Sequence, residues 1–411
     1  MIAVTTALAH SPARAQSDAI DTLGRFRRTG TASEAFKPVD QQGAYAEQLK
    51  ANIERITLPP GFKIELYAIV PDARHMAVGP QGVAVFVGTR KEEVWVVSDR
   101  DKDRHADEVK RFAPSVRFHI PNGPCFSRDG VLYIAEQNRV LAFPAAEFFY
   151  ESPDVAVETV VKQGELIPAE EESFNHTARV CDIGPDNKLY IGLGQPYNVP
   201  PPDKLKTYDQ LGIGGIIRLE RSGANREVYA RGVRNSVGMD FRPATQEVWF
   251  TDNQVDGMGD DIPPGELNRS TTPGQHFGFP WFGGGKVRTK EYQDSQPPAD
   301  VVFPVVEFPA HAADLGMIFY TGSQFPEKYR GGIFSAEHGS WNRTVPVGAQ
   351  LMFTPVKQDG SAGAPEVFAK GWLTEAGEYI GRPVDVAQLP DGSIIVSDDL
   401  AGALYRISHD K

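Results

Sequence analysis

The chain has 411 residues, of which 41% are hydrophobic and 23% charged, and this balance excludes a globally disordered protein. Its formal net charge of −12 disfavours nucleic acid as a partner, so an anionic ligand would have to be held by local clusters of arginine and lysine. The 40 glycines and 32 prolines suit many short strands joined by tight turns. Beyond the first residues, no apolar run is long enough to cross a bilayer.

Residues 1–15 resemble the end of a secretory signal, because a mildly apolar run is followed by the small-x-small pattern Ala13-Arg14-Ala15. We interpret them as a possible signal peptide remnant, which predicts a periplasmic or secreted protein. The basic segment that normally opens such a signal is missing, and a disordered tail is the alternative. Residues 16–55 form a predicted N-terminal extension with one short helix outside the main body, because helix-forming residues are found at 18–30 and from 43 onwards.

From residue 56 onwards the chain repeats one pattern: an apolar strand, a turn with proline, aspartate or glycine, and a second strand. Six copies begin at Met76, Cys125, Val180, Gly238, Phe325 and Val386, and a Gly/Pro-rich insertion fills the widest gap, from about Asn268 to Phe325. Repeats of this length predict an all-β fold, a six-bladed β-propeller over residues 56–411. Since the inner strands of a propeller converge on one channel, residues at the ends of the repeats are expected to meet there.

The two cysteines, Cys125 and Cys181, lie far apart in the sequence. No CxxC or CxxCH motif is present, which argues against haem attachment and against a cysteine zinc site. The sequence leaves two interpretations open, a disulfide or two buried free thiols. No GxGxxG motif opens a helix after a strand, and neither a GxSxG elbow nor HExxH is present.

His176 and the pair Arg234-Asn235 occupy equivalent places, just before the third and the fourth repeat. Histidine is the usual general base near neutral pH, and arginine binds carboxylate or quinone oxygens. A hydrogen-bonding histidine and an arginine that ties blades together are the structural alternatives. We expect Asn175 to hold the imidazole tautomer and Arg179 to orient a ligand.

Other polar residues also gather near the ends of repeats. They are His311, Glu337, His338, Trp341, Asn342, Arg343 and Arg382. An oxygen-rich loop holds Asp252, Asn253, Asp256, Asp260, Asp261, Glu266 and Asn268. Such a loop suits calcium, although its spacing is not that of an EF-hand, and a simple turn before Pro263-Pro264 is the alternative for two of the aspartates.

With these residues in hand, the chain resembles the glucose/sorbosone dehydrogenase family from about Leu58 to Ser408. The most specific segments are NHTARVCDIGPDNKLYIGLG, RGVRNSVGMDF, TDNQVDGMGDDIPPGELN, HFGFPWFGG, AEHGSWNR and GRPVDVAQLPDGSIIVSDD. Members of this family are soluble six-bladed propellers that use pyrroloquinoline quinone (PQQ) with calcium.

The resemblance implies a role for individual residues. His176 would be the general base, although its acidic partner in glucose-oxidising members is replaced by Asn175 in this chain, and an amide cannot raise the basicity of the imidazole as a carboxylate does. Arg234 would act beside it. Contacts to the cofactor would come from Asn235, Arg382, His311, Arg343 and Asn122, and the metal site from Asn253, Gln254 and Val255, the last two through backbone oxygens.

The chemistry implied is the oxidation of a sugar or an aldehyde, with the hydride passing to the quinone and calcium acting as a Lewis acid. Trp341 and Phe279 would wall the substrate. The electrons would then pass to a cytochrome or a quinone. Two alternatives remain: a calcium-dependent lactonase, which would need an acidic metal site and no arginine cluster, and a non-catalytic propeller that binds a protein or a glycan.

Overall fold

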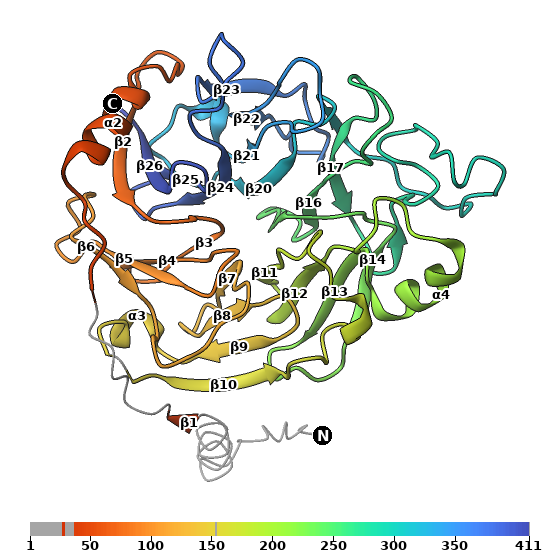
Figure 1. The fold of residues 1–411 in the computed structure, drawn as a ribbon, viewed down its shortest axis with the longest axis horizontal. Coiled ribbons are helices and arrows are strands. Elements are labelled where there is room, and N and C mark those ends of the chain that lie inside the picture. Colours follow the sequence, from red (N-terminus) through yellow and green to blue (C-terminus); the bar gives the residue numbers. More distant parts are fainter. Residues whose placement is uncertain (1–26, 29–36, 153, 411) are drawn as a thin grey trace, which may run out of the picture.

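The computed structural model describes residues 27–28, 37–152 and 154–410, so the predicted signal remnant at residues 1–15 lies outside the described part of the chain. Six sheets of mainly antiparallel strands surround a central axis, with β3, β7, β11, β20 and β24 labelled nearest the centre (Figure 1). This arrangement confirms the predicted six-bladed β-propeller.

The strands of each blade follow one another from the centre of the ring outwards. Blade one has β3 (Met76–Val78), β4 (Ala84–Val87), β5 (Trp95–Ser98) and β6 (Glu108–Arg111). Blade two has β7 (Gly123–Phe126), β8 (Leu132–Ala135), β9 (Val140–Phe143), β10 (Ala156–Val161) and β1 (Arg27–Arg28). Blade three has β11 (Val180–Ile183), β12 (Lys188–Leu193), β13 (Gly215–Glu220), β14 (Glu227–Arg231) and the parallel strand β18 (Gln275–His276).

Blade four has β15 (Gly238–Phe241), β16 (Val248–Asp252), β17 (Gly265–Ser270) and β19 (Val306–Phe308). Blade five has β20 (Asp314–Phe319), β21 (Ile333–Glu337), β22 (Gln350–Thr354) and β23 (Glu366–Lys370). Blade six has β24 (Pro383–Gln388), β25 (Ile394–Asp398), β26 (Ala403–His409) and β2 (Phe62–Ile69).

The ring is closed by strand β2, which precedes blade one in the sequence but completes blade six. It pairs antiparallel with β26, from Phe62 opposite His409 to Ile69 opposite Ala403. The C-terminal end of the chain therefore lies beside β2 and α2 (Figure 1). Because β26 is paired on both sides, by β25 and by β2, the last strand presents no free edge.

The turn between the first and the second strand explains why the repeats fold as tight hairpins. In every blade this turn contains a residue with positive φ, a conformation that glycine and asparagine adopt readily. These residues are Gly82, Gly130, Asn187, Gln246, Gly331 and Gly392. Apolar side chains from neighbouring sheets meet between the blades; the rings of Phe86 and Phe126, for example, pack edge to face with centroids 5.5 Å apart.

In the described part of the chain, the helices are short and lie outside the ring of sheets. They are α2 (Ala44–Ile53), α3 (Ala146–Phe149) and α4 (Pro202–Leu211), with 3-10 turns at Ala169–Glu171 and Glu327–Tyr329. α2 buries Ala46 and Leu49 in the same apolar cluster as Trp372 and Ile407, which agrees with the predicted helix in the N-terminal extension. The other predicted helical stretch, 18–30, lies outside the described residues except for the two residues of β1.

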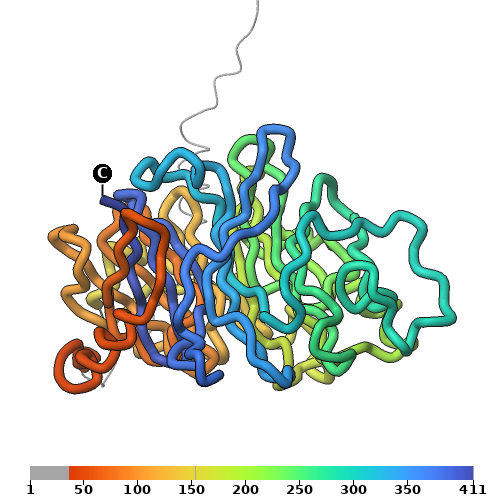
Figure 2. Tube along the Cα trace, turned by 90° about the horizontal axis from the view of Figure 1, so that it is seen from above, coloured from red at the N-terminus to blue at the C-terminus, as the bar shows by residue number. Residues whose placement is uncertain are grey.

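The fifth predicted repeat began at the wrong strand. The inner strand of blade five is β20, whereas Phe325 lies in the turn between β20 and β21. This turn is itself rich in buried aromatic side chains, among them Tyr320, Phe325 and Tyr329, and it therefore resembles a strand in the sequence. The predicted insertion is present: residues 277–305 contain no strand of blade four, and the teal segment projects from the body of the molecule (Figure 2).

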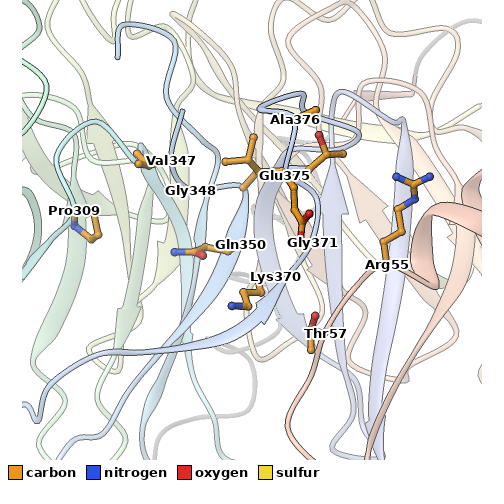
Figure 3. Close-up of a pocket in the computed structure, with 13 residues that line it drawn as sticks. Arg55, Thr57, Pro309, Val347, Gly348, Gln350, Lys370, Gly371, Glu375 and Ala376 are labelled. Atoms are coloured by element: carbon orange, nitrogen blue, oxygen red, sulfur yellow. The ribbon is translucent and has the colours of Figure 1, made fainter. Parts of the chain in front are cut away.

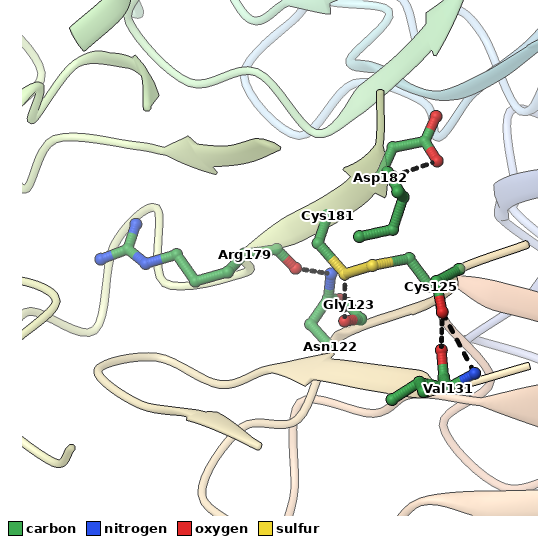
Figure 4. The surroundings of a disulfide bond; sticks show 9 residues. Asn122, Gly123, Cys125, Val131, Arg179, Cys181 and Asp182 are labelled. Carbon is green, nitrogen blue, oxygen red and sulfur yellow. Dashed lines mark hydrogen bonds between the residues drawn. A yellow bond between two sulfur atoms is a disulfide. The ribbon is translucent and has the colours of Figure 1, made fainter. Parts of the chain in front are cut away.

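Cys125 on β7 and Cys181 on β11 form a disulfide, with their Cα atoms 5.7 Å apart (Figure 4). The interpretation as two free thiols is therefore wrong. The sequence could not settle the pairing because it depends on the inner strands of blades two and three lying side by side in the channel.

Candidate active site

Two sets of residues meet at one mouth of the central channel. One set precedes the inner strands, and the other follows the second strands, which run antiparallel to them. A cavity of about 670 Å³ opens there. Its polar lining residues are Arg74, Arg90, Asn175, His176, Thr177, Asn198, Arg234, Asn235, Asp256 and His338, and its apolar ones include Phe174 and Trp341.

His176, the predicted base, precedes β11 and lines this cavity. Its Nδ1 lies 2.5 Å from the backbone oxygen of Gln195. Because a carbonyl only accepts, Nδ1 carries the hydrogen and Nε2 keeps its lone pair. Burial and the nearby charge of Arg234 lower the pKa of His176 to about 3, so the ring is neutral at pH 7. The expected partner, Asn175, is exposed and does not hold the imidazole.

Arg234 precedes β15 and is only 4% exposed. Its guanidinium donates to the backbone oxygen of Asn198 at 3.1 Å and to Asp256 at 2.9 Å. The backbone amides of Arg234 and Asn235 donate to the two oxygens of Asp252, at 2.8 and 2.6 Å. Asp252 therefore fixes the loop, and Asp256 and Asn198 fix the guanidinium at the cavity wall.

Asn235 lines the cavity and has a buried side-chain oxygen, Oδ1, without a hydrogen-bond partner in the described part of the chain. Gly194 lies against it: a Cβ at this position would come within 2.3 Å of Asn235 Oδ1 and 2.8 Å of the Cβ of His176. The absence of a side chain at residue 194 thus allows His176 and Asn235 both to pack against this position.

Arg74 and Arg90 were not predicted. Arg74 precedes β3 and is 4% exposed, with Nε 2.9 Å from Asn122 Oδ1 and Nη1 2.6 Å from Asp399. Asn122 also donates to the backbone oxygen of Arg179, at 2.8 Å. Asn122 is fully buried beneath the cavity rather than in its wall, so its contact is with Arg74 instead of a ligand. The position of Arg74 before an inner strand is the signal that could have identified it.

Three predicted cofactor residues are near the mouth but direct their side chains to protein groups. Nε2 of the buried His311 contacts the backbone oxygen of Gly259 at 2.7 Å, and its Nδ1 contacts Gln254 at 3.1 Å. Arg343 donates to the backbone oxygens of Val345 and Ala310 and to Asp261. Arg382 donates to the backbone oxygens of His338 and Gly339. None of the three lines the cavity.

The predicted metal loop runs beside the cavity, behind Arg234. The carbonyl of Asn253 accepts from Arg234 at 3.2 Å, and the side-chain amide of Asn253 donates to the backbone oxygens of Asn235 and Asp314. Gln254 Oε1 is buried and lacks a partner among the described residues, and the amide of Val255 donates to Gly283 at 2.8 Å. Arg179, expected to orient a ligand, instead donates to the backbone oxygens of His176 and Gly194.

Another cavity, of about 840 Å³, lies at the outside of the propeller (Figure 3). It is lined by Arg55 and Thr57 after α2, by Lys370 at the end of β23 and by the following loop. None of the predicted site residues lines it. Of the two aromatic residues expected at the substrate, Trp341 lines the channel-mouth cavity and Phe279 does not.

The fold and this cavity define a six-bladed β-propeller with an arginine-rich cavity at the mouth of its channel. The chain belongs to the glucose/sorbosone dehydrogenase family, whose model matches residues 150–406. Within the described residues, the structure has no helix with the length and apolar character that a membrane span requires.

Similar proteins fall into two groups, one found by sequence and one by structure. An uncharacterized protein of Borreliella burgdorferi is 36% identical over 249 residues, which are 60% of this chain and 64% of that protein. The chain spans between about half and two-thirds of the length of the curated relatives that it matches. A calcium structure of a family AA12 carbohydrate-active enzyme from Trichoderma reesei has a TM-score of 0.72 at 18% identity, covering 86% of this chain and 97% of that one. The PQQ domain of pyranose dehydrogenase from Coprinopsis cinerea has a TM-score of 0.68 at 16% identity, with the same coverage.

Proposed function

We propose that the chain is a PQQ- and calcium-dependent oxidoreductase that oxidises a sugar or an aldehyde. The observation that carries the proposal is the cavity at the channel mouth, where Arg74, Arg90 and Arg234 place guanidinium groups around two imidazoles. A cluster of this kind in a chain with a net charge of −12 suits a small, multiply anionic ligand. It does not suit a lactonase, which needs an acidic metal site.

The residues present fit the quinone cofactor. PQQ carries three carboxylates and an o-quinone, which arginine binds well, and it needs no nucleotide-binding fold. The buried Oδ1 of Asn235 lacks a partner among the described residues, so it can accept a hydrogen bond from an N–H or O–H group of a ligand. The PQQ domain of the Coprinopsis protein, which shares this fold, supports the choice of cofactor.

The residues behind Arg234 fit a calcium ion. Backbone oxygens near Gln254 and Val255, with the unpartnered Oε1 of Gln254, are hard oxygen donors of the kind that calcium prefers. The calcium structure of the Trichoderma enzyme supports the same metal. When bound, PQQ would supply the hydride acceptor and calcium would supply a Lewis acid.

The protein itself supplies the proton acceptor and the walls. Two neutral imidazoles face the cavity, His176 and His338, and the proton of the substrate hydroxyl goes to one of them; the sequence predicts His176. Arg234 holds the developing negative charge on the substrate oxygen. Trp341 is 74% exposed at the rim, where its ring can stack on a sugar.

We also propose that the electrons pass to a cytochrome or a quinone. The protein would be exported to the periplasm or the medium. The disulfide between Cys125 and Cys181 supports export, because such bonds persist in oxidising compartments. Fractionation of cells that produce the protein checks this, with the protein expected outside the cytoplasm.

Reconstitution tests the proposed function. PQQ and calcium are added to the purified apoprotein, and dye reduction is followed with aldoses, sorbosone, simple aldehydes and alcohols. We expect turnover that requires both additions, is lost in Arg74→Ala and persists in Arg117→Ala, an arginine with an 88% exposed side chain outside the cavity. Lactone hydrolysis without PQQ, or glycan binding without any turnover, would contradict the proposal.

A further inference from the structure

His338 is a second imidazole at the cavity, and a carboxylate orients it. It follows β21, and its Nε2 lies 2.8 Å from Oδ1 of Asp399, which follows β25. Because a carboxylate accepts, Nε2 carries the hydrogen and Nδ1 keeps the lone pair. No other hydrogen bond of this ring is found within the described residues, so Nδ1 is free for a ligand in the cavity that His338 lines.

Asp399 is held from two sides. Its Oδ2 lies 2.6 Å from Nη1 of Arg74, and Nε of Arg74 is in turn bound to Asn122 at 2.9 Å. Burial opposes ionisation of Asp399, but the contacts with His338 and Arg74 outweigh it and hold the pKa of the carboxyl well below its usual range. A fixed, ionised carboxylate therefore stands behind the His338 ring.

The surroundings of the two imidazoles differ in one respect that matters for proton transfer. A proton on Nε2 of His176 would face the charges of Arg234, Arg179 and Arg90, with only a backbone carbonyl behind the ring. A proton on His338 would face Arg382 and Arg74, but it would also be stabilised by the carboxylate of Asp399. Carboxylate–imidazole pairs stabilise the imidazolium that forms when the ring accepts a proton.

We propose that His338, oriented by Asp399, is the general base of the reaction, and that His176 binds the substrate hydroxyl without taking its proton. This inference rests on the proposed function. The substrate O–H bond breaks and its proton goes to Nδ1 of His338, while the electron pair of that bond forms the carbonyl. The adjacent C–H bond breaks at the same carbon, and its hydride passes to the quinone cofactor. Arg382 acts as a positioning residue, because its Nε donates a hydrogen bond to the backbone oxygen of His338 at 3.0 Å.

The first test uses the apoprotein and needs no turnover. Nitrogen-15 NMR of the histidine rings should show His338 as the Nε2–H tautomer, and Asp399→Asn should shift its titration midpoint to lower pH, since the variant keeps the hydrogen bond and loses the charge. The exposed His105 should titrate identically in both proteins. A His338 ring protonated on Nδ1, or a midpoint unmoved by Asp399→Asn, would overturn the assignment.

The second test uses the reconstituted enzyme. His338→Ala should lower kcat by about 10²- to 10⁴-fold with PQQ affinity retained, as loss of a general base does. Asp399→Asn should move the acid limb of the kcat/KM profile to lower pH, an effect that a merely structural role would not produce. His176→Ala should mainly raise KM.

The outcomes separate this inference from the proposed function. Normal turnover in His338→Ala, with loss of turnover in His176→Ala, would overturn the assignment of the base and leave the proposed function standing. The NMR spectra could show the expected His338 tautomer and the expected effect of Asp399→Asn while the wild-type protein has no PQQ-dependent turnover. That result would overturn the proposed function and the catalytic role of His338 together.

Discussion

At the scale of single residues, the candidate site depends on side chains that the protein has already fixed. Arg234 is buried, and its guanidinium donates to Asn198, Asn253 and Asp256 before any ligand is present. Holding the group in advance reduces the conformational entropy that a ligand must overcome. The same bonds need the planar fork of arginine, which lysine cannot reproduce.

Arg234→Lys should therefore keep the charge and still impair the site. We expect a loss of about tenfold to 10³-fold in kcat/KM, together with a lower melting temperature, because the backbone oxygens of Asn198 and Asn253 lose their donors. Steady-state kinetics with PQQ and calcium, and thermal unfolding of the apoprotein, check the two effects. Kinetics equal to wild type would show that Arg234 does not act on the ligand.

Gly194→Ala tests the close packing of His176 and Asn235 against residue 194. The added Cβ would lie 2.3 Å from Asn235 Oδ1, so these side chains must move, at a cost of about 1–3 kcal/mol in stability and with loss of most turnover. Gly363→Ala is a matched control, because its Cβ would meet only Pro355 at ordinary distances. If the two variants retain equal activity, the close approach at Gly194 has no functional role.

At the scale of elements, the disulfide joins the inner strands of two blades. Cys125 lies on β7 and Cys181 on β11, and both line the cavity between the inner strands; Figure 4 shows the bond that joins them. The bond closes a loop with a sequence separation of 56 residues. Cross-linking a loop of this size lowers the entropy of the unfolded chain and stabilises the fold by up to about 4 kcal/mol.

A variant with both cysteines replaced by alanine should unfold at lower urea concentration than the oxidised wild type, by about 2–4 kcal/mol in free energy. Reducing agent should destabilise the wild type by a similar amount and leave the variant unchanged. Equal unfolding curves for oxidised and reduced wild type would contradict this prediction.

At the scale of the whole molecule, an acidic protein buries several carboxyl groups. Burial is the main reason that the pKa of Asp385 rises to about 7 and that of Glu337 to about 7. The folded state then binds protons that the unfolded state has released, so these groups stabilise the fold below pH about 4 and lose that contribution as pH rises towards about 7. Asp399 has the opposite shift, and its contribution is lost only in acid.

The melting temperature of the calcium-free apoprotein should consequently fall between pH 5 and pH 8. In the wild type, the backbone N–H of Met76 donates to the Asp385 carboxylate at 2.8 Å. In Asp385→Asn the side-chain oxygen of asparagine can still accept this hydrogen bond, but the side chain does not titrate, so the dependence on pH should be weaker. Thermal unfolding monitored by circular dichroism checks both. A melting temperature that rises steadily over this range would contradict the raised pKa values.

The sequence predicted the architecture because each blade repeats the same hairpin signals, and it predicted the meeting of His176, Arg234 and Asn235 because all three precede inner strands. It also listed His338 and Trp341, which follow the second strand of blade five and line the cavity, but it missed Arg90 and Asp399, which follow the second strands of blades one and six. Nor could it show that Arg382 and Arg343 direct their guanidinium groups to backbone carbonyls, because that depends on loop conformation. The sequence also could not establish the disulfide or the first strand of blade five, because both depend on which segments are neighbours in space.

The most direct measurement is an equilibrium titration of PQQ into the calcium-loaded apoprotein, followed by absorbance and compared with Arg74→Ala and Arg117→Ala. We predict saturable binding of one PQQ per chain, weakened at least about tenfold by Arg74→Ala and unchanged by Arg117→Ala. No saturable binding, or equal affinity in all three proteins, would contradict the claim that the channel mouth holds the cofactor.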